Sequence, residues 1–262
     1  MPSLDFCRKR QERLLARMAA AQLDFAIMSS PRMVYYFSGA LVESNWPQSF
    51  VLSASGASML VTNREPAQCA AVEVRTYTGY TIQRFFDRGT MQEELQNEIA
   101  AFLGGGKKSI GAEFEAAPIG LAPGLWRSAT NIAPWLAEMR RPKDPDEIDC
   151  IRATIALTEA GYAAARNRCE PGMSEYQAYS IIQDAMVAAA ETAVDLKGDF
   201  ACGTRAINGG GPPTSRLIER GDLYILDLFP IHRGYMCDLC RTFCMGTATS
   251  AQKEVWAHVL EA

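Results

Sequence analysis

Two aspartates interrupt apolar segments on either side of a predicted turn. Asp227 and Asp238, eleven residues apart, each lie within a run rich in Leu, Ile, Tyr and Phe. The segment 231–234 between them suits a type I turn that ends with Gly234 in the left-handed conformation. A hairpin folded about this turn brings the aspartates opposite each other, within one residue of register, with Cβ atoms about 5 Å apart. Because close carboxylates in apolar surroundings repel each other and lose hydration, the pKa of one of them should rise sharply unless a cation lies between them.

Three interpretations of this pair are open from the residues alone. The aspartates accept structural hydrogen bonds from Arg241, Thr242 or the main chain, or they share a proton as the carboxylates of aspartic proteases do. In the third interpretation they hold a divalent metal, because facing carboxylates suit Mn, Co, Fe, Zn or Mg. Strand parity puts Thr242 on the face of Asp238 and near such a metal, whereas Arg241 points the other way, towards a structural salt bridge.

Two further groups near the hairpin contain residue types that are common in functional sites, but their positions argue against such a role. His232 falls on the predicted turn and is expected to be a solvated loop residue. Cys237 and Cys240 form a CxxC, but side chains three apart on a strand point to opposite faces, and no second CxxC accompanies them. We therefore exclude a zinc site and expect the eight cysteines to be mostly free, buried thiols.

A short charged segment divides the chain. Residues 140–146 hold two prolines and five charges, so they are not expected to form a core element. We predict a first domain over 1–140, a linker over 141–146 and a second domain over 147–262. The first domain is predicted as an α/β unit, with helices near the N-terminus and over 92–102 and strands at the segments 25–28, 31–39, 49–63, 71–77 and 107–114.

The second domain is predicted to begin with two helices. Apolar residues recur at helical spacing from Ile148, and Ser174 and Gln177 have the spacing of a capping box before a second helix. Strand and turn patterns follow after residue 198. Thr249 and Gln252 then open another helix, which is interrupted where the sequence stops.

Composition excludes several classes of function. A net charge of −4 gives no reason to expect nucleic acid as a partner, and no window has about 18 uninterrupted apolar residues, so no membrane span is expected. The N-terminus lacks the apolar core of a signal peptide. A cytoplasmic protein is the expectation.

The hairpin sequence resembles a known pattern. Residues 221–227 and 234–243 are similar to the GDxxxxD…GYxxDxxRTF pattern of the creatinase, aminopeptidase P and prolidase family, the pita-bread metallopeptidases. Upstream, 141–148 resembles the RxxKxxxEI entry to the family's catalytic domain, 171–175 its PGxTE helix start, and 31–39 a strand motif of its N-terminal domain. The resemblance therefore covers nearly the whole chain.

The resemblance implies a fold and an activity. The fold is α/β (α+β), with a creatinase-type N-terminal α/β domain followed by part of a pita-bread catalytic domain with a curved antiparallel sheet. Asp227 matches the aspartate that chelates one metal of a dinuclear centre, and Asp238 the one that bridges both metals. The implied function is metal-dependent hydrolysis of an Xaa-Pro peptide bond by water activated at two divalent ions (Mn, Co, Zn or Fe), in a homodimer whose N-terminal domain helps to close a partner's active site.

Two departures from the family pattern shape the expectation. The remaining ligands, one His and two Glu, are expected beyond Ala262, so the 262 residues alone are expected to be inactive and to bind metal weakly at most. Gly210 stands where peptidase members carry a histidine that contacts the substrate or the reacting centre. The alternatives are therefore a small-molecule C–N hydrolase, similar to creatinase or ectoine hydrolase, and a non-catalytic binding module of the same fold.

Overall fold

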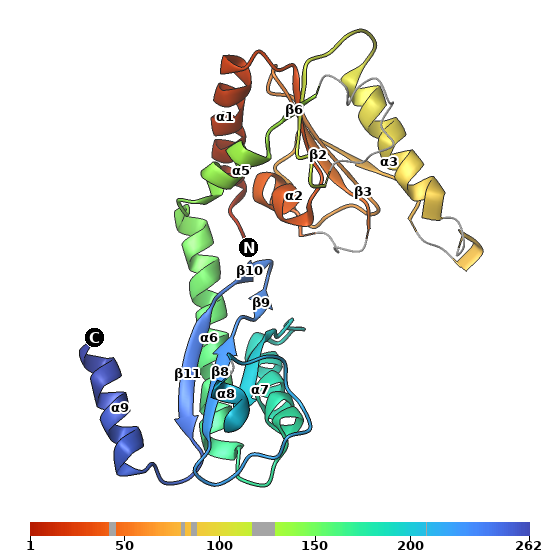
Figure 1. Ribbon diagram of the computed structural model, residues 1–262. Helices are drawn as coiled ribbons and strands as arrows, with labels where there is room; N and C mark the ends of the chain where they lie inside the picture. Colours follow the sequence, from red (N-terminus) through yellow and green to blue (C-terminus); the bar gives the residue numbers. More distant parts are fainter. Residues whose placement is uncertain (42–45, 80–81, 85–87, 117–128, 208) are drawn as a thin grey trace. The chain divides into compact units, whose positions relative to one another are not determined.

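The computed structural model describes two compact units of mixed α/β structure, in agreement with the fold class inferred from the sequence (Figure 1). The units are Met1–Glu147 and Ile148–Ala262. The described residues are 1–41, 46–79, 82–84, 88–116, 129–207 and 209–262. Among them, no helix combines the length and the apolar character needed to cross a membrane.

The first unit is built on one six-stranded sheet with the strand order β4-β3-β2-β1-β5-β6. Strands β1, β2 and β3 pair antiparallel, while β4, β5 and β6 join in parallel. Its elements are α1 (Leu4–Ala20), β1 (Phe25–Met28), α2 (Pro31–Ser38), β2 (Ser49–Ser53), β3 (Ser58–Thr62), β4 (Glu73–Thr76), the 3-10 turn η1 (Ile82–Arg84), α3 (Arg88–Leu103), β5 (Ile110–Ala112), β6 (Thr130–Asn131) and α5 (Ala133–Arg140).

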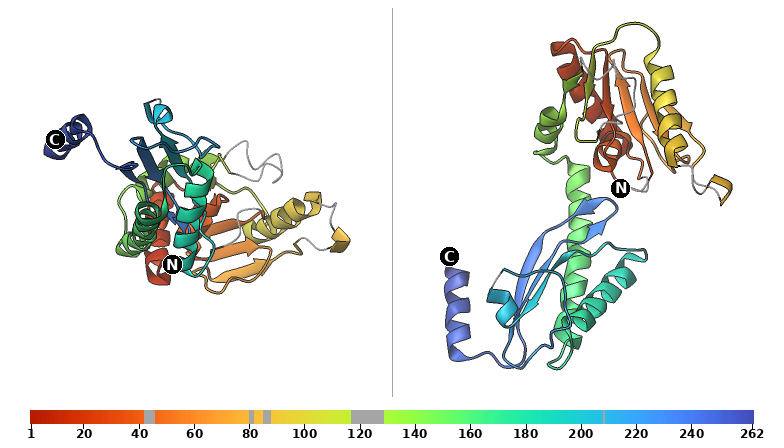
Figure 2. Two further views of the ribbon diagram at one scale, coloured as in Figure 1. Left: turned by 90° about the horizontal axis from the view of Figure 1, so that it is seen from below. Right: turned by 45° about the vertical axis from the view of Figure 1, so that its right-hand side comes forward.

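Helices cover both faces of this sheet. In Figure 2, α1, α2 and α5 lie on one side of the strands and α3 lies on the other. Along β1, Ala26 and Met28 belong to the core under α1, α2 and α5, whereas Phe25 and Ile27 belong to the core under α3. A strand buried on both faces shows no polar alternation, which is why the sequence of β1 is a continuous apolar run.

The prediction of a strand over 31–39 is wrong, because Pro31–Ser38 forms helix α2. Val, Tyr and Phe favour strands, but Ser30 caps this helix by accepting a hydrogen bond from Met33 N, and Pro31 occupies its first turn. All side chains from Met33 to Ser38 are buried. The strand propensity of Val, Tyr and Phe therefore outweighed the local signals of a helix start in the prediction.

Two acids at the start of α6 (Pro145–Arg168) and just before it, Asp146 and Asp144, pack against the first unit, whereas Arg141, Pro142 and Lys143 are exposed. Arg10 on α1 is fully buried and forms ion pairs with Asp144, Asp146 and Glu147. Its Nε donates to Asp144 Oδ2 over 2.8 Å. These three acids can lie at the edge of the core because a single guanidinium compensates them.

Replacement of Arg10 should destabilise the first unit strongly. Arg10→Met leaves three largely buried carboxylates without their shared cation, which costs about 3–5 kcal/mol of unfolding free energy. Urea unfolding measures this loss. Arg8→Met is the matched control on the same helix, since Arg8 is half exposed and forms an ion pair with exposed Asp5, and its effect should stay within about 0.5 kcal/mol. An Arg10 variant as stable as the control would contradict the assigned role.

The second unit contains a three-stranded antiparallel sheet with the order β11-β8-β7 and a two-stranded extension, β9 with β10. The chain can be followed from α6 to α9 in Figure 2. After α6, the elements are α7 (Glu175–Ala190), β7 (Gly198–Cys202), α8 (Thr204–Ile207), β8 (Leu223–Leu228), β9 (Ile231–His232), β10 (Tyr235–Met236), β11 (Leu239–Cys244) and α9 (Ser250–Glu261).

The two faces of the three-stranded sheet differ in their packing. Helices α6 and α7 cover one face, where Phe200, Tyr224 and Leu226 join their side chains in a single buried cluster. The predicted capping boxes of α7 and α9 are confirmed, with Ser174 and Thr249 as the capping residues. Because side chains alternate along each strand, the residues between the buried ones point to the opposite face. The face opposite to α6 and α7 carries the predicted site residues.

Candidate metal centre

The hairpin predicted around 231–234 is present, with a tighter turn than expected. His232 pairs with Tyr235, so the turn consists of Arg233 and Gly234, and both have positive φ angles of 49° and 76°. Two left-handed residues define a type I′ hairpin turn rather than the type I turn that was predicted. His232 therefore belongs to strand β9 and is buried, not solvated.

The pairing register differs from the one inferred from the sequence. Asp227 lies opposite Cys240, and the last pair of the ladder is Leu228 with Leu239, so Asp238 lies just beyond the ladder. Asp238 is two residues from Cys240 and therefore faces the same side of the sheet as Asp227, displaced along the strand. The two aspartates are still close enough for their side chains to interact.

A third carboxylate lies on the same face. Asp199 on β7 pairs with Asp227 on the side opposite to Cys240, so the three residues form one row across the sheet. Directly paired residues have Cβ atoms about 5 Å apart. Sequence analysis missed Asp199, because a lone aspartate between Gly198 and Phe200 gives no signal until its strand is known to pair with β8.

The electrostatics of the row are unfavourable without a cation. Burial raises the pKa of the Asp227 carboxyl above its ordinary value, and the negative charges of Asp238 and Asp199 raise it further. The Oδ1 atom of Asp227 is buried and has no hydrogen-bond partner within the described part of the chain. Such an unsatisfied carboxylate oxygen is costly to keep, which indicates a ligand at this point.

Gly210 packs directly over Asp199. Its φ angle is +99°, and a Cβ atom built on it would lie 2.6 Å from Asp199 Oδ2 and 2.8 Å from Asp199 Cβ. No side chain fits there while Asp199 keeps this position. A histidine, which the resemblance implies for peptidases at this place, is therefore incompatible with this arrangement.

A buried glutamate fixes the segment that carries Gly210. Glu175 at the start of α7 is fully buried and accepts hydrogen bonds from Cys202 N, from the main chain and hydroxyl of Thr214, and from Arg205. Arg205 also donates to the carbonyl oxygens of Phe200 and Pro212. Strand β7 and the residues around Gly210 are thus tied to one helix end, which holds Gly210 against Asp199.

The other residues predicted near the site divide between the two faces. Thr242 lies on β11 opposite Ile225, on the face of the aspartates. Arg241 points to the helices, where its guanidinium is 3.8 Å from Glu159 and above the ring of Tyr162, as a structural salt bridge requires. Cys237 is buried against Thr158 and Cys240 is exposed, so the pair does not act as a chelate.

An apolar groove adjoins the acidic row on the same face. It lies between the sheet and α9 and has a volume of about 590 Å³. Thr242, Ile225, Leu223, Trp256 and Val259 are among its lining residues. The site therefore has an acidic end and an apolar end.

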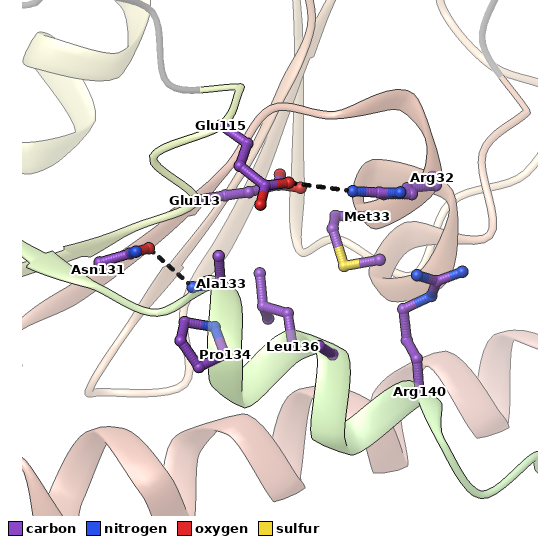
Figure 3. Close-up of a pocket in the computed structure, with 10 residues that line it drawn as sticks. Arg32, Met33, Glu113, Glu115, Asn131, Ala133, Pro134, Leu136 and Arg140 are labelled. Carbon is purple, nitrogen blue, oxygen red and sulfur yellow. Dashed lines mark hydrogen bonds and ion pairs between the residues drawn. The ribbon is translucent and has the colours of Figure 1, made fainter.

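A smaller hollow in the first unit has no comparable unsatisfied carboxylate among its described residues (Figure 3). Its buried carboxylate, Glu113, already accepts hydrogen bonds from Ser29 N, Ser30 N and the Ser30 hydroxyl at the start of α2. Glu115 forms a solvent-exposed pair with Arg32. Both acids have partners, so the unsatisfied carboxylate of the second unit is the stronger indication of chemistry.

The aspartates of this face could supply some of the ligands that a divalent ion needs. Asp227 and Asp238 offer hard carboxylate oxygens, one of them without a partner, and this is the chemistry that Mn, Mg and related ions accept. Within the ranges that the structure describes, no group of three or more His, Cys, Asp or Glu side chains is arranged to hold a metal. The two aspartates alone therefore supply only part of a coordination shell.

Comparison with known proteins identifies the family. Residues 10–141 match the creatinase/prolidase N-terminal domain, and residues 149–262 match metallopeptidase family M24. The chain belongs to the creatinase, aminopeptidase P and prolidase family of pita-bread proteins.

Relatives with assigned activities cover most of the chain at low identity. An Xaa-Pro dipeptidase of Pyrococcus horikoshii is 23% identical over 264 residues, which is 99% of this chain and 70% of that protein. A creatinase of a Bacillus species is 23% identical over 267 residues, 95% of this chain and 62% of the relative. The relatives of this chain thus include both peptidases and a creatinase.

Solved structures confirm the fold. The prolidase of Pyrococcus furiosus superposes with a TM-score of 0.74 at 18% identity, covering 94% of this chain and 69% of the other. An Xaa-Pro dipeptidase of Bacillus anthracis gives a TM-score of 0.76 at 18% identity, covering 97% and 70%. The described residues therefore have the fold of these enzymes.

Neutralising Asp227 should stabilise the metal-free protein at neutral pH. A carboxylate with a raised folded-state pKa adds most stability below its unfolded pKa of about 4 and loses it as the pH rises through the folded value. Asp227→Asn should therefore raise the thermal midpoint in EDTA at pH 7 and have little effect near pH 4. Thermal unfolding across this pH range measures the difference.

Asp184→Asn provides the control for this prediction. Asp184 is on the exposed side of α7, 3.7 Å from Arg168, and its side chain is 75% exposed. The same substitution there should leave the pH dependence unchanged. An Asp227 variant that is less stable than the wild type at pH 7 in EDTA would show that the carboxylate has a structural partner.

Proposed function

We propose that the full-length protein hydrolyses an Xaa-Pro peptide bond with water activated at a dinuclear metal centre. The observation that supports this most is the unsatisfied carboxylate of Asp227 beside Asp238, on a hairpin that carries the family's sequence pattern. The assignment of Asp227 to one metal and Asp238 to both follows from the resemblance. Mn, Co, Zn and Fe all suit such a site.

In this reaction, the residues of this chain would bind the metal ions and keep the parts of the site in position. Asp227 and Asp238 would hold the ions, Thr242 would lie beside them on β11, and Glu175 would keep β7 and Gly210 in place. When bound, two divalent ions lower the pKa of water and polarise the scissile carbonyl. The C–N bond breaks, the hydroxyl of water goes to the carbonyl carbon and its proton goes to the proline nitrogen.

Further features of the proposed enzyme come from the family resemblance. One His and two Glu beyond Ala262 would complete the coordination shell. We propose a cytoplasmic homodimer in which the N-terminal domain of one chain helps to close the active site of its partner. The peptide substrate would approach the face of the sheet that carries Asp227.

A small-molecule C–N hydrolase is the second candidate. The observation that favours it is the contact between Gly210 and Asp199, which excludes the histidine implied for peptidases. The creatinase relative and the dipeptidase relative are both 23% identical to this chain. Such an enzyme would use the same carboxylates on an amidino or cyclic compound.

Metal content and substrate turnover of the full-length protein test the proposal together. We expect about two metal ions per chain by plasma mass spectrometry, and release of proline from Ala-Pro. Asp227→Asn and Asp238→Asn should each lower the metal content and reduce turnover by about 100-fold or more. Asp184→Asn should match the wild type in both measurements.

Different results would select an alternative. Turnover of an amidine with none of Ala-Pro would replace the peptidase by the C–N hydrolase. A full-length chain that retains its fold but binds no metal would contradict both and leave the binding module.

A further inference from the structure

Asp199 is a charged residue of the site to which no role has yet been assigned. It lies in the row with Asp227 and Cys240, on the face that carries Asp238. It makes no hydrogen bond and no ion pair within the described part of the chain. A carboxylate held on a strand by backbone pairing on one side and by Gly210 on the other keeps a fixed position without a fixed partner.

The position of Asp199 does not complete a metal site. No set of three ligating side chains, drawn from the residues that the structure describes, is arranged to hold an ion. Asp199 lies on the far side of Asp227 from Cys240 and β11, whereas Asp238 lies beyond the β11 end of the ladder. Two divalent ions carry four positive charges, which Asp227, Asp238 and the two glutamates proposed beyond Ala262 would balance, so the charge of Asp199 would be left uncompensated.

The position of Asp199 depends on the glycine at residue 210. The Cβ atom of any other residue at 210 would lie within 2.8 Å of the Asp199 carboxylate and its Cβ. Glu175 and Arg205 hold the surrounding segment, so the main chain cannot simply move away. Gly210 and Asp199 therefore form a pair in which the absence of one side chain makes room for the charge of the other.

We propose that Asp199 determines the specificity of the site by binding a cationic nitrogen of the substrate next to the scissile bond. This inference rests on the proposed metal-dependent hydrolysis. A fixed carboxylate beside metal-compensated aspartates attracts an ammonium or amidinium group and disfavours a neutral or anionic one. The α-ammonium of a peptide and the amidinium of a small molecule share this chemistry, so the experiment must separate them.

Binding of inert ligands to the metal-loaded full-length protein tests this role without relying on turnover. The probes are benzamidinium, benzylammonium and neutral benzamide, measured by calorimetry. We expect at least one cation to bind about tenfold or more tightly than benzamide, as a charge-assisted hydrogen bond provides. A preference for benzamidinium would indicate an amidine substrate, and a preference for benzylammonium would indicate a peptide amine.

Asp199→Asn removes the charge and keeps the shape of the side chain. It should abolish the preference for the cation while the metal content by mass spectrometry stays unchanged. Asp184→Asn, the same substitution on exposed α7, should retain the preference. Loss of metal in the Asp199 variant would overturn the proposal in favour of a ligand role, and a wild type that binds benzamide as tightly as both cations would also overturn it.

A stability measurement tests the pairing with Gly210 independently. Gly210→Ala should lower the thermal midpoint, and the loss should be smaller when Asp199→Ala has already removed the two nearest atoms, Oδ2 and Cγ. Equal losses in the two backgrounds would contradict the pairing. If cation binding depends on Asp199 but neither Ala-Pro nor an amidine is hydrolysed, the proposed function fails while the assignment of Asp199 stands.

Discussion

The register of three antiparallel strands determines the chemistry of the second unit. Pairing of β8 with β7 on one side and β11 on the other places Asp199, Asp227 and Cys240 in one row, with Asp238 close by. A shift of one residue in either ladder would turn the aspartate of the shifted strand towards the helices, where α6 and α7 form an apolar cluster. The type I′ turn at Arg233–Gly234 and the packing of Leu226 and Leu228 fix this register.

The charges around Arg10 and those around Asp227 differ in whether they are compensated within the chain. In the first unit, Arg10 forms ion pairs with three carboxylates, so these charges compensate one another within the chain and have a structural role. In the second, carboxylates gather on one sheet face and Asp227 keeps an oxygen without a partner. A satisfied network stabilises a fold, whereas an unsatisfied one lowers stability until a ligand arrives. This contrast, rather than the number of acidic residues, distinguishes the candidate centre from the hollow lined by Glu113 and Glu115.

Motifs that depend only on neighbouring residues were predicted correctly from the sequence. The capping boxes at Ser174 and Thr249 depend on residues three apart, and the structure contains both. The segment 31–39 failed because its burial depends on packing against a sheet whose other strands come from distant parts of the chain. The burial of Asp144 and Asp146 could not be predicted for a similar reason, since their compensating cation lies more than 130 residues away, at Arg10.

The sequence by itself determined the family, the hairpin and the shared face of Asp227 and Asp238, because each depends on local spacing and strand alternation. Only the tertiary structure decided which residues stand beside them. Asp199 and Gly210 come into contact through the pairing of β7 with β8 and the anchoring by Glu175. Strand pairing joins residues that are far apart in the chain, and its register is set by the packing of whole faces, so no local pattern contains it.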